Sequence, residues 1–143
     1  MKILVDTSIW SLALRRIGTQ SHNDQFLVQE LSELINDLRV VITGPIRQEL
    51  LSGITSNTQF NILKEKLQAF VDVPVKTNHY EKAAEFFNIC RRKGVQGSHI
   101  DFLICSIASI NNFEIFTTDK DFLLYANHIP ISLYNPEKHH KKK

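Results

Sequence analysis

The stretch ILVDTS, residues 3–8, decides the fold of this chain. Three consecutive aliphatic residues, two of them β-branched, predict a short buried strand over residues 2–5. Polar capping groups follow at once and predict a helix from Ile9, so the strand runs directly into a helix. Asp6 stands at this junction. A charge directly after a buried strand is costly unless it caps the helix or binds a ligand.

The rest of the chain repeats this alternation of strands and helices. Short apolar runs predict further strands at residues 40–43, 71–73, 114–117 and 129–133. Amphipathic or apolar spacing predicts the helices between them, at residues 9–16, 24–38, 45–53, 57–70, 77–93, 99–111 and 119–126. Strands that alternate with helices predict a parallel sheet covered on both faces, with right-handed crossovers. We therefore expect an α/β fold.

Length and composition favour one globular domain. The chain has 143 residues, and 43% of them are hydrophobic, which is enough for a core. The formal net charge is +2, and the four lysines of residues 138–143 contribute +4, so residues 1–137 carry −2. A net charge this small does not identify a nucleic-acid-binding protein. We expect a domain over residues 1–134 and a disordered, basic tail over residues 135–143.

Cysteine usage and hydropathy predict a cytoplasmic protein. Cys90 and Cys105 lie in apolar helical contexts and are expected to be buried free thiols rather than a disulfide framework. No cysteine–histidine spacing resembles a zinc site. The first residues lack the pattern of a secretory signal, and no apolar run is long enough to cross a bilayer.

Four acidic residues form the candidate site. Asp6 and Asp119 follow predicted strands, whereas Glu49 and Asp101 lie in apolar helical segments. In a parallel sheet, ligands gather outside the carboxyl ends of the strands, so acids from distant parts of the chain can meet there. Two carboxylates about 4 Å apart repel each other by about 4 kcal/mol at an effective dielectric constant near 20. Mg²⁺ or Mn²⁺ would offset that repulsion, so the pattern predicts metal-dependent phosphate chemistry.

Each of these acids also has a plainer interpretation. Asp6 and Asp119 could cap the helices that follow them. Asp101 could lie in a first helical turn, where the helix dipole favours it, and Glu49 could be an ordinary surface residue. Asp121 is a possible fifth member, although a solvent-facing position is the simpler expectation. The joint placement of the four favours a site.

Neighbouring hydroxyl and cationic residues complete the candidate set. Thr7, Ser8 and Thr117 could orient carboxylates or water by hydrogen bonding, or could serve as caps and strand ends. The cationic residues could line a path for a phosphate backbone, or could be solvated residues at helix ends: Arg15, Arg16, Arg47, Arg91, Arg92 and Lys93. The remaining acids, among them Asp24, Glu30, Glu33 and Asp37, are expected on polar helix faces.

Four short motifs, taken in order, resemble the PIN-domain ribonucleases, and among these the VapC toxins of bacterial toxin–antitoxin pairs. The motifs are residues 3–8, residues 49–53, GSHIDFLI at residues 97–104 and TTDKDF at residues 117–122. The resemblance implies a three-layer α/β/α PIN-like domain with a central parallel sheet. It also implies endonucleolytic cleavage of RNA that depends on Mg²⁺ or Mn²⁺.

The resemblance also assigns residues and partners. The acidic quartet of the family falls on Asp6, Glu49, Asp101 and Asp119, its supporting hydroxyl on Ser8 or Thr7, and its later threonine on Thr117. Family members usually form homodimers and are held inactive by a cognate antitoxin, whose tail enters the acidic groove. An RNA substrate, an antitoxin and a second copy of the chain are therefore the expected partners, without a membrane.

Two other functions stay open at this point. The first is a Mg²⁺-dependent phosphomonoesterase with Asp6 as the nucleophile. Its usual second acid, two residues further on, is replaced by Ser8. The second is a non-catalytic receiver or interaction module in which the acids only bind a metal ion. We find no nucleophile elbow, P-loop or dinucleotide fingerprint in the sequence.

Overall fold

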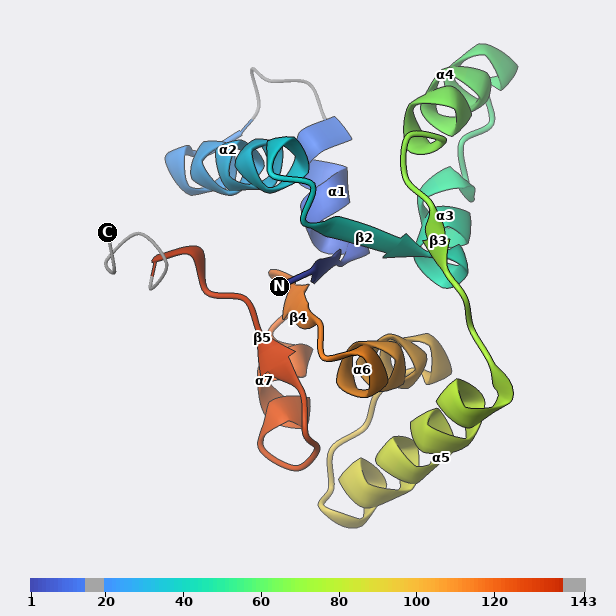
Figure 1. The fold of residues 1–143 in the computed structure, drawn as a ribbon, viewed down its shortest axis with the longest axis vertical. Helices are drawn as coiled ribbons and strands as arrows, with labels where there is room; N and C mark the ends of the chain where they lie inside the picture. Colours follow the sequence, from blue (N-terminus) through green and yellow to red (C-terminus); the bar gives the residue numbers. More distant parts are fainter. Residues whose placement is uncertain (15–19, 138–143) are drawn as a thin grey trace.

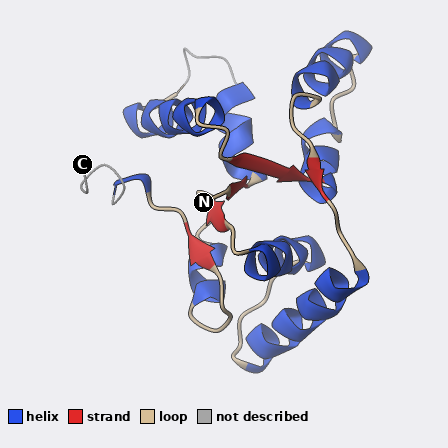
Figure 2. Cartoon of the chain, in the orientation of Figure 1, coloured by secondary structure: helices blue, strands red, loops and turns tan. Residues whose placement is uncertain are grey.

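A parallel β-sheet forms the centre of the protein (Figures 1 and 2). The computed structural model describes residues 1–14 and 20–137. Within them the sheet has five strands in the order β3-β2-β1-β4-β5, and every neighbouring pair is parallel. The strands are β1 (Ile3–Val5), β2 (Val40–Thr43), β3 (Asp72–Val73), β4 (Glu114–Phe116) and β5 (Ser132–Leu133).

Helices cover both faces of the sheet, which confirms the three-layer α/β/α architecture. Helices α1 to α4 lie on one side and α5 to α7 on the other (Figure 1). The helices are α1 (Thr7–Leu14), α2 (His22–Asn36), α3 (Gly44–Leu51), α4 (Asn57–Leu67), α5 (Thr77–Arg92), α6 (His99–Asn111) and α7 (Asp121–Ala126). No described helix combines the length and the apolar character that crossing a bilayer requires.

Strand β1 and helix α6 contribute heavily to the hydrophobic core. All three residues of β1 are completely buried, as expected for an inner strand of a parallel sheet. Helix α6 is apolar on nearly every side, and its residues 104–108 are almost fully buried. Complete burial of an aliphatic side chain contributes about 1.5–3 kcal/mol relative to exposure. Cys90 and Cys105 belong to this core and are free thiols, as predicted.

The direction in which strands are added to the sheet reverses between β1 and β4, which makes this a topological switch point. From β1 the chain proceeds through β2 to β3 on one side, whereas β4 and β5 lie on the other side of β1. The helices that follow β1 and β4 therefore diverge to opposite faces and leave a crevice at the carboxyl ends of these strands. The N–H group of Asp6 donates to the carbonyl of Phe116, 2.9 Å away, and extends the pairing of the two strands. The residues that follow β1 and β4 consequently lie side by side.

Several element boundaries differ from the prediction. Helix α2 begins at His22 rather than Asp24, because the Ser21 hydroxyl caps it by accepting from the Asp24 N–H group. Leu38 was predicted as the last residue of the helix at residues 24–38, but it lies beyond α2 with φ of 58° and is 79% exposed, so the prediction extended this helix too far. Residues 15–19, which include Arg15 and Arg16, and residues 138–143 of the basic tail lie outside the described part of the chain.

Two polar residues are more buried than their sequence context indicates. Glu30, predicted to be on a polar helix face, is 2% exposed and accepts a hydrogen bond from the Tyr134 hydroxyl. The segment that follows β5 therefore packs over α2 at this point. His79 is also buried, and its Nδ1 accepts from the N–H group of Lys76 at 2.8 Å. Helix α5 accordingly begins at Thr77, as predicted, with Lys76 at the cap position.

Candidate metal and active site at the carboxyl end of the sheet

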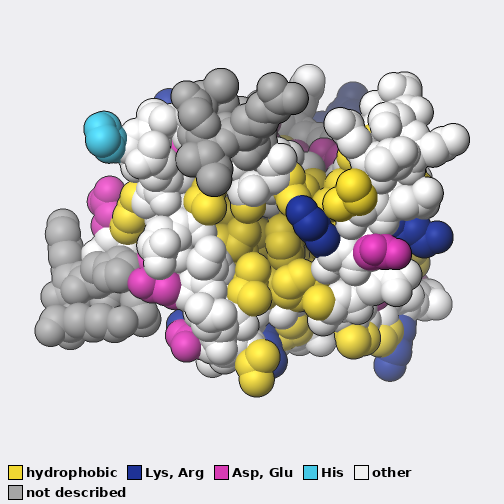
Figure 3. Space-filling model, turned by 90° about the horizontal axis from the view of Figure 1, so that it is seen from above, with side chains coloured by type: hydrophobic (Ala, Val, Ile, Leu, Met, Phe, Trp, Pro, Cys, Tyr) yellow, Lys and Arg dark blue, Asp and Glu magenta, His cyan; other side chains and the backbone are white. Residues whose placement is uncertain are grey.

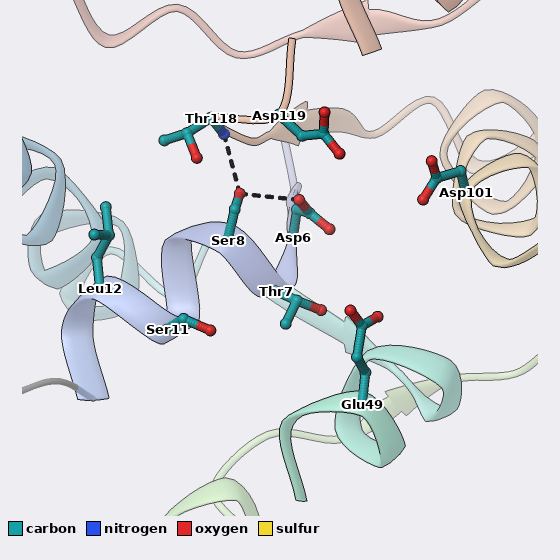
Figure 4. A pocket seen from close by; sticks show the side chains of 9 residues that line it. All are labelled: Asp6, Thr7, Ser8, Ser11, Leu12, Glu49, Asp101, Thr118 and Asp119. Atoms are coloured by element: carbon teal, nitrogen blue, oxygen red, sulfur yellow. Dashed lines mark hydrogen bonds between the residues drawn. The ribbon is translucent and has the colours of Figure 1, made fainter. Parts of the chain in front are cut away.

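A pocket of about 360 Å³ lies at the switch point, and all four predicted acids line it (Figure 4). Asp6 comes from the end of β1, Glu49 from α3, Asp101 from α6 and Asp119 from the loop between β4 and α7. Their carboxylates point toward the same space in Figure 4. The fold thus brings together side chains from the start, the first third and the last third of the chain.

Hydrogen bonds from two hydroxyl groups hold the Asp6 carboxylate in place. Asp6 is only 7% exposed. Its Oδ2 accepts from Ser8 Oγ at 2.9 Å and from Thr117 Oγ1 at 2.7 Å. The first backbone hydrogen bonds of α1 run from the N–H groups of Ile9 and Trp10 to the carbonyl of Asp6. Among the described residues, the partners of the carboxylate are these two hydroxyl groups rather than backbone N–H groups of α1, so it is fixed at one oxygen and does not cap the helix.

The same hydroxyl groups anchor the loop after β4. Ser8 Oγ accepts from the N–H group of Thr118 at 3.0 Å, and Thr117 Oγ1 accepts from that of Asp119 at 3.0 Å. Each hydroxyl has one proton, which it donates to Asp6, and a lone pair that accepts from the backbone. Asp6 and the loop that carries Asp119 are in this way held in one network.

Asp101 lies in the first turn of α6. Its N–H group donates to the Ser98 hydroxyl at 3.0 Å, which caps the helix. Because Asp101 lies at the N-terminal end of α6, the helix dipole also favours its negative charge. Its Oδ2 accepts a 2.7 Å hydrogen bond from the hydroxyl of Tyr125. Burial raises the pKa of Asp101, while the hydrogen bonds from Tyr125 and Ser98 lower it in part. The negative charges of Asp119 and Asp6 raise that pKa further, as expected when carboxylates share a site.

Asp121, expected to face solvent, is exposed but also joins the acidic group. Asp101, Asp119 and Asp121 each offer a carboxylate oxygen within 4.8 Å of the other two. Asp119 Oδ1 also accepts from the N–H group of Asp121 at 2.9 Å, so Asp119 does help to begin α7. The capping role and a role in the pocket are thus compatible for this residue.

The donor set fits a hard divalent cation. Asp6, Glu49, Asp101 and Asp119 supply carboxylate oxygens, which Mg²⁺ and Mn²⁺ prefer. Thr7 also lines the pocket, and its buried Oγ1 has no hydrogen-bond partner among the described residues. A buried hydroxyl without a partner is costly, and a bound ion or its water would satisfy it. Of the three predicted supporting hydroxyls, Ser8 and Thr117 contact Asp6, whereas Thr7 faces the pocket itself.

Sequence reasoning did not single out Tyr125, although its hydroxyl touches an acid of the pocket. The residue lies in an ordinary apolar helical pattern, LLYA at residues 123–126. Its contact with Asp101 depends on how α7 packs against α6, and nothing in the local sequence signals it.

The fold and the pocket define a three-layer α/β protein with an acidic crevice at the switch point of a parallel sheet. The chain belongs to the PIN domain family, whose family model matches residues 3–127. A comparison with curated proteins gave no match.

Several solved structures share the fold of this chain. The chain is similar to one in FitAcB from Neisseria gonorrhoeae, with a TM-score of 0.74, 21% identity and coverage of 94% of this chain and 98% of that one. It also resembles a chain of VapBC2 from Rickettsia felis bound to a DNA fragment from its promoter, with a TM-score of 0.73, 19% identity and coverage of 94% and 98%. VapBC-5 from Mycobacterium tuberculosis, of the VapBC family of toxin–antitoxin systems, gives a TM-score of 0.63, 18% identity and coverage of 94% and 97%.

Proposed function

We propose that this protein is a Mg²⁺- or Mn²⁺-dependent endoribonuclease, and that it acts in the cytoplasm as the toxin of a toxin–antitoxin pair. The observation that carries the proposal is the convergence of Asp6, Glu49, Asp101 and Asp119 on one pocket of a PIN domain. Residues 1–134 would form the nuclease domain, with residues 135–143 as a basic tail.

In this proposal some pocket residues bind the ion and others orient the reactants. Asp6 and Asp101 would be the main ligands, Asp119 a ligand directly or through water, and Glu49 a ligand or the group that orients the attacking water. When bound, the divalent cation supplies Lewis acidity, which makes water more acidic and offsets charge on the phosphate. Ser8 and Thr117 keep the Asp6 carboxylate in one orientation through their hydrogen bonds.

An antitoxin and a second copy of the chain are the proposed protein partners. The similar structures FitAcB and VapBC2 support this proposal through their shared fold. Figure 3, seen from the side of α1 to α4, shows hydrophobic side chains gathered in a hollow between α2 and α4. Exposed apolar surface of this kind is typical of protein interaction sites. The acidic pocket would receive a basic tail of the antitoxin by charge complementarity.

The strand order does not favour the receiver alternative. Receiver domains have the order 2-1-3-4-5, whereas this sheet has the order 3-2-1-4-5. The phosphomonoesterase alternative requires a second acid at the position of Ser8, whose hydroxyl instead donates to Asp6. Incubation with a phosphomonoester and a search for phosphorylated Asp6 would separate that alternative from a nuclease.

A cleavage assay with purified protein tests the proposal. Wild-type protein in Mg²⁺ or Mn²⁺ should cleave RNA internally, and EDTA should stop the reaction. The variants Asp6→Asn and Asp101→Asn should be folded by circular dichroism but inactive. Full activity in either variant, or equal activity with EDTA, would refute the assignment. Sequencing of the new RNA ends after brief expression in cells would then identify the substrate.

A further inference from the structure

The hydroxyl group of Tyr125 reaches the candidate metal site from the buried side of α7. The Tyr125 side chain is completely buried. Its ring packs against Phe102 and Phe122, with centroids 4.8 and 5.3 Å away. Its hydroxyl donates a 2.7 Å hydrogen bond to Oδ2 of Asp101. A rigid, packed ring thus delivers one donor to one oxygen of a pocket carboxylate.

Gly97 provides the space for this approach. A Cβ atom at position 97 would lie 2.8 Å from Tyr125 Cζ and 2.9 Å from Phe102 Cε2, and even closer to the Tyr125 hydroxyl. Distances below 3.0 Å force something to move. Any larger residue at position 97 would therefore force the Tyr125 side chain, Phe102 or the backbone at residue 97 to move, which disturbs the hydrogen bond to Asp101. Tyr125 consequently donates the hydrogen bond to Asp101, and Gly97 leaves the space in which it forms.

The bond counteracts the repulsion within the acidic group. Asp101 shares its surroundings with Asp119 and Asp121, whose oxygens lie within 4.8 Å. A carboxylate in such a group would turn toward solvent unless something held it. Tyr125 holds Oδ2, so Oδ1 remains available for a ligand on the pocket side, into which the carboxylate points in Figure 4. Partners of this kind commonly fix the orientation of metal ligands.

We propose that Tyr125 is a positioning residue that, with the space left by Gly97, orients the Asp101 carboxylate for a divalent cation. The inference rests on the proposed metal-dependent function and deepens it, because it adds a residue that does not itself line the pocket. A purely structural role would instead make Tyr125 a packing residue whose loss affects only stability.

The chain offers a matched control for the test. Tyr134 is also a buried tyrosine whose hydroxyl donates to a carboxylate, that of Glu30, and neither residue lines the acidic pocket. Tyr125→Phe and Tyr134→Phe therefore remove the same group from similar surroundings and keep the packed ring. Both variants are expected to melt at a lower temperature than wild type.

The deciding measurement is the affinity for Mn²⁺ alone, by isothermal titration calorimetry on the full chain. Tyr125→Phe should weaken Mn²⁺ binding about tenfold, as loss of such a partner typically does. Tyr134→Phe should bind Mn²⁺ as wild type does. RNA cleavage should distinguish the two variants in the same way: at saturating RNA, kcat should fall in Tyr125→Phe and stay at the wild-type value in Tyr134→Phe. Wild-type affinity in Tyr125→Phe, or an equal loss in both variants, would overturn the inference.

A second variant covers the case in which Tyr125→Phe does not fold. Gly97→Ala keeps the hydroxyl but displaces it, so it should also weaken Mn²⁺ binding. When added to Tyr125→Phe, it should cause a smaller further loss than in wild type, because the hydroxyl is already gone. Unchanged binding in Gly97→Ala would contradict the inference. A wild-type chain that binds no Mn²⁺ would overturn the proposed function as well, which distinguishes the two failures.

Discussion

Thr117 donates a 2.7 Å hydrogen bond to Oδ2 of Asp6, although 111 residues separate the two in the chain. The bond joins the ends of β1 and β4, which are neighbours in the sheet. Thr117 also accepts from the N–H group of Asp119. A single hydroxyl therefore couples two acids of the pocket to the strand pairing at the switch point.

Removal of this hydroxyl should affect both stability and cleavage. Thr117→Val keeps the β-branched shape but removes the partner of the Asp119 N–H group and leaves Asp6 Oδ2 with the Ser8 hydroxyl alone. We expect the free energy of unfolding to fall by about 1–3 kcal/mol. Cleavage should fall by about tenfold, because the Asp6 carboxylate loses its orientation. Urea denaturation and initial rates on a model RNA measure the two effects. Thr55→Val, in the exposed loop between α3 and α4, is the control and should leave both unchanged.

Glu49 is an exposed member of the acidic quartet, so its role depends on charge rather than packing. Glu49→Gln keeps the size of the side chain and removes the negative charge that binds an ion or orients water. We expect the cleavage rate to fall by about 100-fold, within the range for a positioned acid or base. Glu33→Gln, on the exposed face of α2, is the matched control. Similar rates for the two variants in single-turnover assays would remove Glu49 from the proposed site.

The fold could be predicted from the sequence because its signals are local. The run at Val40–Thr43 is both the predicted and the observed strand β2, and the predicted helix at residues 99–111 matches α6. The acids Asp6 and Asp119 stand just after apolar strands, so the parallel sheet places them at one edge. Their convergence follows once the alternation of strands and helices is recognised.

Contacts that depend on packing between distant elements could not be predicted in this way. Glu30 has the spacing of a surface residue, and only the return of Tyr134 over α2 buries it. The bond from Tyr125 to Asp101 likewise requires α7 to lie against α6. Leu38 fits the apolar spacing of α2, yet the helix has already ended before it. Periodicity describes one element at a time, so it misses these relationships.

A divalent cation should stabilise the folded protein, because carboxylates that repel one another would share it. Mg²⁺ or Mn²⁺ at 100 times its Kd adds about 2.7 kcal/mol to the free energy of unfolding. Calorimetric melting of chelator-treated protein, with and without added ion, measures the gain. Asp6→Asn should lose most of it. An equal gain in wild type and Asp6→Asn would locate the bound ion elsewhere on the protein.

The raised pKa of Asp101 predicts how stability without metal depends on pH. Burial makes the folded protein hold a proton at Asp101 more tightly than the unfolded chain does. Stability is therefore lost as the pH rises from the ordinary aspartate pKa of about 3.9 through the raised value. Asp101→Asn removes this cost and still accepts from Tyr125, so in EDTA at neutral pH it should melt above wild type. The difference should close below about pH 4, and a variant that melts lower at neutral pH would contradict the prediction.

Arg47 tests whether a cation of α3, the helix that carries Glu49, serves RNA binding or the fold. Its guanidinium group donates to Asp72 at 2.9 Å and to the carbonyls of Leu67 and Phe70 at 3.0 and 2.7 Å, so it closes the end of α4. Arg47→Lys loses this planar fork and should reduce the free energy of unfolding by about 1–3 kcal/mol. The cleavage rate of the folded variant should be unchanged, because all three contacts point to the protein. Arg92→Lys, exposed at the end of α5, is the control for stability. A reduced rate with wild-type stability would instead place Arg47 on the path of the RNA backbone.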